Sequence, residues 1–125
     1  MNTQEWTITR IEPATQCRDR GGNAMLSGYC FEAELLRGSQ QHLVRIGITK
    51  QAMTTAMEFL LRDGVIDQKD PCAAGRALVR AHLVGLLAPQ HTGQWEPTNH
   101  RHLTIDSHCV ADVCRQLLAA LAVSD

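Results

Sequence analysis

The spacing of apolar residues along the chain changes character at Thr49. Before this residue, apolar and polar side chains mostly alternate, which is typical of strands that bury one face. After it, apolar residues recur three and four positions apart, which is typical of amphipathic helices. The pattern therefore predicts strands mainly in the first half of the chain and helices mainly in the second.

Three strands are predicted before Thr49. Residues 5–11 are rich in β-forming side chains, and residues 25–36 and 43–48 alternate clearly. Residues 37–40 separate the last two strands and include Gly38, so these two strands form a predicted hairpin. Its predicted inward side chains are Met25, Tyr29, Phe31, Ala33, Leu35, Val44, Ile46 and Ile48.

Two helices are predicted next. Thr49 can cap the first helix, which is expected to end at Gly64, a residue suited to the left-handed position after a helix. Asp70 followed by Pro71 is a start signal for the second helix, which is expected to continue to about Leu87. Apolar residues cover most of the circumference of the second helix, so we expect it to be the most buried helix.

A short strand is predicted at residues 100–105, followed by a last helix that Asp106 or Ser107 would cap. The predicted order is β-β-β-α-α-β-α. We interpret residues 1–125 as a single α+β domain, in which a mostly antiparallel sheet of three or four strands carries three helices on one face. Because the late strand would join the same sheet, the two halves are not expected to be separate domains.

Composition supports a globular protein, with 44% hydrophobic and 20% charged residues. No stretch approaches the roughly 20 apolar residues of a membrane span, and the first residues do not resemble a secretory signal, so a cytoplasmic protein is predicted. The net charge of −1 disfavours bulk binding of nucleic acid. Arg76 and Arg80 lie one helical turn apart and are interpreted as a solvated surface.

The chain has five cysteines, an odd number that does not indicate a framework of disulfides in a cytoplasmic protein. Most of them are expected to be reduced and buried. Cys72 and Cys109 each fall in the first turn of a predicted helix, where the helix dipole stabilises a thiolate. Either residue is a candidate nucleophile, and the alternative is an ordinary small side chain.

The C-terminal part of the chain is rich in histidine and cysteine, the usual ligands of zinc. On a strand, His100 and His102 would project from the same face, and His108 or Cys109 would complete a site across the following turn. The alternative is a polar outer strand face. The sequence lacks the phosphate-binding, dinucleotide-binding, nucleophile-elbow and metalloprotease motifs.

Residues 89–99 show neither the alternation of a strand nor the three- and four-residue spacing of a helix. This stretch carries Trp95 among polar neighbours. An aromatic side chain on a polar loop is typical of an interface anchor, although Trp95 could instead cover the core. The predicted interaction residues are His91, Gln94, Trp95 and Glu96.

These features favour a non-enzymatic regulator or inhibitor that binds a protein partner or a second copy of itself, with no cofactor. If the first strand lies at a sheet edge, its free backbone groups would also invite pairing. The alternative is a zinc-binding module or metal-dependent enzyme that uses His100, His102, His108 and Cys109.

Overall fold

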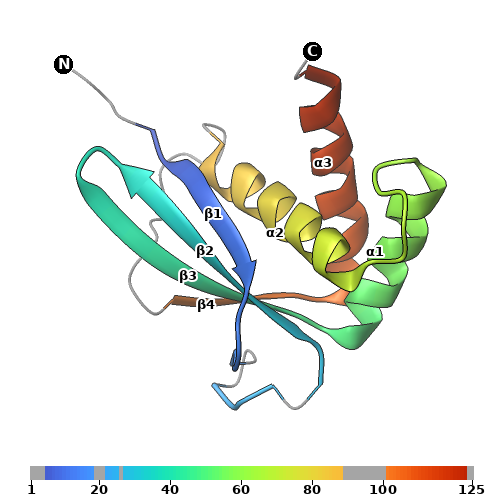
Figure 1. Cartoon of the computed structure of the whole chain (residues 1–125), viewed down its shortest axis with the longest axis horizontal. Coiled ribbons are helices and arrows are strands. Elements are labelled where there is room, and N and C mark those ends of the chain that lie inside the picture. The colour runs from blue at the N-terminus through green and yellow to red at the C-terminus, as the bar shows by residue number, and fades with distance from the viewer. Residues whose placement is uncertain (1–4, 19–21, 26, 89–100, 124–125) are drawn as a thin grey trace.

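A four-stranded sheet with three helices on one face forms the described part of the chain, residues 5–18, 22–25, 27–88 and 101–123 of a computed structural model (Figure 1). The order β-β-β-α-α-β-α and the α+β class are as predicted. The elements are β1 (Thr7–Pro13), β2 (Tyr29–Arg37), β3 (Gln40–Ile48), α1 (Lys50–Arg62), α2 (Pro71–Leu87), β4 (Arg101–Ile105), a short 3₁₀ helix η2 (Ser107–Cys109) and α3 (Val110–Val123).

The hairpin of β2 and β3 forms the centre of the sheet. Its register pairs Arg37 with Gln40 across a two-residue turn, in which Gly38 has a φ of 62°, a value that glycine adopts without strain. The side chains that the alternation directs toward the helices are buried, with two exceptions. Met25 precedes the strand, and Tyr29, at its first position, is 36% exposed, so the predicted strand began too early. The buried set comprises Phe31, Ala33, Leu35, Val44, Ile46 and Ile48.

Strand β1 pairs antiparallel with β2 and contains a β-bulge. The register is regular at Ile8 and again at Arg10 but shifts between them, which leaves Thr9 as the extra residue. Ile8 lies opposite Leu35 and Ile11 lies opposite Ala33, so both isoleucines face the helices although they are three positions apart. The bulge therefore keeps both apolar side chains of this strand inward.

Strand β4 pairs with β3 in parallel, so the sheet is mostly but not wholly antiparallel. Helix α2 has 17 residues and is therefore about 25 Å long. It runs back along the sheet, and β4 begins opposite Val44 and runs in the same direction as β3 (Figure 1). At the opposite end, the Thr49 amide donates a hydrogen bond of 3.3 Å to the carbonyl of Ile105.

The boundaries predicted for the first two helices are confirmed, whereas the predicted cap of the last helix is wrong: Asp106 makes no side-chain capping bond, and η2 precedes α3, which begins at Val110. The Thr49 hydroxyl accepts a hydrogen bond from the Ala52 amide at 3.1 Å. At the end of α1, Gly64 has a φ of 74°, and the Val65 amide donates to the Leu60 carbonyl at 2.8 Å, as in a Schellman motif. Asp70 is the N-cap of α2, and its carboxylate accepts a hydrogen bond from the Cys72 amide at 3.0 Å.

The buried residues form one cluster that includes the inner face of the sheet and all three helices. Helix α2 contributes six buried residues, more than α1 or α3, as predicted. Helix α3 packs chiefly against α2 and α1 and buries Cys114 in its apolar stripe. Trp6 is half-buried at the edge of this core, with the Arg37 guanidinium 4.4 Å from its ring centre. Within the described residues, no helix has both the length and the apolar character to cross a membrane.

Most of the cysteines, three of five, are free as expected, but of these only Cys114 is buried, and the other two cysteines are paired. Cys17 and Cys30 form a disulfide that attaches the segment after β1 to the start of strand β2. Met25 packs beside this bond, against Gly47 of β3, where a Cβ atom would overlap its sulfur. Cys72, Cys109 and Cys114 are free. The sequence did not reveal the pair because the two cysteines meet only when the segment folds over the sheet.

Two glycines of α2 lead to opposite stability predictions. A Cβ atom at position 75 would overlap the buried ring of Phe31, whereas one at position 85 would meet the exposed amide end of Gln116. We expect Gly75→Ala to lower the free energy of unfolding, because overpacking costs about 1–3 kcal/mol and the gain in helix propensity is about 1 kcal/mol. Gly85→Ala is expected to be neutral or stabilising. Urea denaturation measures both, and a stabilised Gly75→Ala would contradict this close approach of α2 to β2.

Removal of the disulfide is expected to destabilise the fold. The bond joins residues 13 positions apart, and a loop of this size stabilises a protein by about 3 kcal/mol through the unfolded state. Changing both cysteines to serine should lower the free energy of unfolding by about 2–4 kcal/mol. Thiol titration of the denatured, unreduced protein should detect three of the five cysteines. Detection of five thiols in protein prepared without a reductant would contradict the pairing.

Candidate functional site

The predicted interaction residues His91, Gln94, Trp95 and Glu96 lie outside the described residues, as does His100 of the predicted metal site. The interaction hypothesis for this loop therefore stays a prediction.

The other predicted metal ligands are separated by strand β4. His102 lies on the outer face of the sheet, opposite Arg45 in the register, because Leu103 and Ile105 take the inner face. His108 is exposed in η2, beyond the other end of the strand, and three residues of strand span about 10 Å. Within the described ranges, no three histidine, cysteine or acidic residues are grouped as metal ligands. A zinc site would need residues outside these ranges, and it stays a prediction.

The two candidate nucleophiles occupy different surroundings. Cys72 is exposed in the first turn of α2. Cys109 is half-buried against the core, and its amide donates a hydrogen bond of 2.9 Å to the carbonyl of Asp106. This packing resembles that of an ordinary small apolar side chain.

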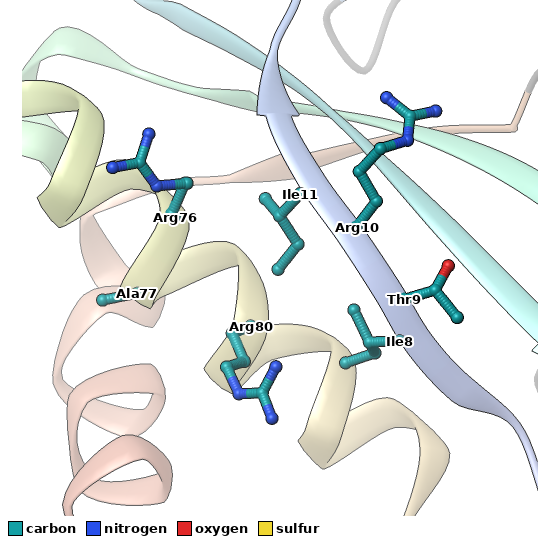
Figure 2. Close-up of a pocket in the computed structure, with 7 residues that line it drawn as sticks. All are labelled: Ile8, Thr9, Arg10, Ile11, Arg76, Ala77 and Arg80. Carbon is teal, nitrogen blue, oxygen red and sulfur yellow. The ribbon is translucent and has the colours of Figure 1, made fainter.

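A groove lies between β1 and α2, with a volume of about 300 Å³. Figure 2 shows Ile8 and Ile11 directed from β1 toward α2, while Arg10 points away to the other side of the strand. Arg76 and Arg80 extend from α2, with Ala77 on the helix between them. The groove thus has an apolar floor and two cationic side chains along one wall. Its lining residues are Ile8, Thr9, Arg10, Ile11, Arg76, Ala77 and Arg80.

The local geometry explains this arrangement. The bulge at Thr9 brings both isoleucines to the inner face, as described above. On α2, positions 76 and 80 are one turn apart and share a face, while Leu78 and Val79 point into the core. The groove therefore depends on the bulge in β1 and on the packing of α2 beside this strand.

The arginines around the groove differ in their partners. Arg10 forms ion pairs with Glu12 at 2.7 Å and with Glu32 at 3.4 Å, and the hydrogen bond to Glu12 is the main reason its pKa is raised. Arg76 and Arg80 are exposed and form no ion pair with any described residue. Two positive charges without an ion pair among the described residues therefore lie beside the groove.

The outer face of the sheet has a different electrostatic character because its charges are paired. Glu32 also contacts Arg45 at 3.5 Å. Glu34 accepts hydrogen bonds from the Thr9 hydroxyl and the Gln41 amide, which hold the pKa of its carboxyl below the usual value. A partner at β1 would therefore meet paired charges on the outer face of the sheet and positive charges on the face toward the helices.

Strand β1 is also an edge of the sheet. The strand order is β1-β2-β3-β4, so among the described residues nothing pairs with the outer side of β1. Alternate backbone amides and carbonyls of an edge strand point away from the sheet and can accept another strand. The groove therefore adjoins a row of backbone groups that can bind an extended chain.

A second, polar hollow lies at the start of α1, lined by Lys50, Gln51, Thr54, Thr55 and Ser107. Four of these five side chains are exposed, and the Ser107 hydroxyl contacts the Gln51 amide oxygen at 3.4 Å. Its volume of about 510 Å³ exceeds that of the β1–α2 groove, but none of its lining residues is aliphatic, whereas Ile8 and Ile11 line the groove.

Sequence reasoning found parts of this site without joining them. It identified Arg76 and Arg80 as neighbours on a helix and the first strand as a possible sheet edge. It did not find the bulge at Thr9 or the packing of α2 beside β1. The three-residue spacing of Ile8 and Ile11 in an otherwise alternating strand was the available signal.

Models of known protein families, curated protein sequences and solved structures were each compared with the chain, and none matched.

The free cysteines are expected to react with iodoacetamide in the order Cys72, Cys109, Cys114. Cys72 is exposed, whereas Cys114 is buried, and burial together with the charge of Asp63 raises the pKa of its thiol. Both effects reduce the accessible thiolate. Peptide mapping after short labelling times measures the order. Fastest labelling at Cys109 would contradict this order and would favour an activated nucleophile at that position.

Proposed function

We propose that this chain is a non-enzymatic regulator or inhibitor that binds a partner protein by adding an extended segment of the partner to the free edge of β1. The observation that carries the proposal is the accessible β1 edge beside the groove formed with α2. The Trp95 loop is a second contact that this proposal retains from the sequence.

Backbone pairing supplies the first part of the binding energy. A strand added to an edge gains main-chain hydrogen bonds whatever its sequence, and pockets for alternate side chains add selectivity. Thr7, Thr9 and Glu12 are exposed along β1. Seven residues of β1 are enough to pair with a short extended peptide.

The groove supplies the second part. Alternate side chains of an added strand would project toward the helix layer and lie next to Ile8, Ile11 and Ala77. Ile8, Ile11 and Ala77 are only partly buried and already contact the core. The methylene groups of a partner side chain that lies over them would remove apolar surface from water, while its polar end stays free to contact other groups.

The cytoplasmic location stays a prediction. Disulfides persist mainly in oxidising compartments, so the Cys17–Cys30 bond argues for such a compartment instead. The proposed binding mode requires neither location.

Filling the groove should weaken binding of a neutral strand-forming peptide. We propose to titrate acetyl-Thr-Gln-Val-Gln-Val-Gln-Thr-amide into isotope-labelled protein and to follow the backbone amides by NMR, which detects affinities as weak as about 1 mM. Amide shifts should concentrate in β1 and the facing turn of α2. Ala77→Gln should reduce the affinity by about fivefold or more, because the longer side chain occupies the groove beside the β1 edge.

The matched control is Ala111→Gln, which places the same side chain at an exposed position of α3 outside the groove. Thermal unfolding of both variants establishes that they fold. Absence of shifts in β1, or equal binding by both variants, would contradict the proposal. Shifts that disappear only with Trp95→Ala would move the interface to the loop.

A further inference from the structure

We infer that the partner segment is acidic and carries Asp or Glu at alternate positions, so that two successive carboxylates on its helix-facing side meet Arg76 and Arg80. This inference rests on the proposed addition of a strand to β1. It specifies the chemistry of the partner, which the proposed function leaves open.

The repeat distances of the two elements agree. Residues four apart on a helix are separated by about 6 Å along its axis. Side chains on one face of a strand repeat about every 6.6 Å. Helix α2 runs alongside β1 in both views, and the two elements line the same groove (Figures 1 and 2). A strand added about 4.8 Å beyond β1 would therefore place consecutive inward side chains opposite Arg76 and Arg80.

The charges select carboxylates for these positions. Arg76 and Arg80 are exposed on one side of the groove and have no ion pair within the described part of the chain. Like charges one turn apart on a helix repel each other, and an opposite charge on a partner relieves this repulsion. Guanidinium groups bind carboxylates through paired hydrogen bonds, which favours Asp or Glu over a neutral amide.

The same observations disfavour a second copy of this chain as the occupant. If β1 of another copy paired with this edge, its inward side chains would be Ile8 and Ile11, and no carboxylate would face the arginines. Glu32 and Glu34 do alternate on β2, but β2 is paired on both sides within the sheet. An acidic, extended segment of a different protein fits better.

The test replaces the glutamines of the neutral peptide by glutamates, giving acetyl-Thr-Glu-Val-Glu-Val-Glu-Thr-amide. At low ionic strength, two exposed ion pairs should make the acidic peptide bind about five- to tenfold more tightly than the neutral peptide. The difference should shrink in about 1 M salt, where the Debye length is about 3 Å. The NMR titration described above measures both affinities.

Charge reversal provides the decisive comparison. Arg76→Glu with Arg80→Glu should abolish the preference for the acidic peptide and create one for the corresponding lysine peptide. The control, Arg62→Glu with Arg115→Glu, changes the net charge equally at exposed positions outside the groove and should keep the original preference.

Failure of this inference differs from failure of the proposed function. Equal affinity for the acidic and neutral peptides, with both lost in Ala77→Gln, would overturn the inference and leave the strand-addition proposal intact. Absence of binding by either peptide would overturn both. Persistence of the acidic preference after charge reversal at positions 76 and 80, or tighter binding of oligo-dT at the same residues, would overturn the inference.

Discussion

The packing of α2 across the inner face of the sheet is the contact on which the other features depend. Gly75 lets the helix backbone approach the ring of Phe31, a buried residue at the centre of the core. This close approach positions the whole helix next to β1 and β2. Strand β4 then pairs in parallel with β3, from Val44 to Ile48. The same placement positions Arg76, Ala77 and Arg80 beside the sheet edge.

The bulge at Thr9 has a comparable role on the opposite wall of the groove. Strict alternation from Ile8 would direct Arg10 and Glu12 into the helix layer and Ile11 outward. The extra residue prevents this and allows Arg10 to pair with Glu12 and Glu32 on the outer face. One irregular position therefore keeps the core apolar and keeps Arg10 away from the helix side of the groove, where Arg76 and Arg80 form no ion pair with any described residue. The proposed function uses this asymmetry between the two faces.

The features that could be read from the sequence are those that depend on neighbours in the chain. The caps at Thr49 and Asp70 and the glycine after α1 bond to residues within one turn, so their pattern was sufficient to predict both helices. The Gly38 hairpin was equally local. Met25 shows the limit of this reasoning. It matches the alternation of β2 but packs on the outer side against Gly47, because the disulfide holds the preceding segment there.

The sequence by itself determined the type and order of the elements and the apolar face of most of them, because periodicity and capping are local. Only the tertiary structure decided that Cys17 meets Cys30, that β4 is parallel to β3, and that β1 is a free edge beside α2. Each of these facts is a pairing between residues distant in the chain, and several pairings are compatible with the same local pattern. The candidate site belongs to this second group. Its two arginines were visible as neighbours on a helix, but their position opposite Ile8 and Ile11 required the packed helix and the bulge.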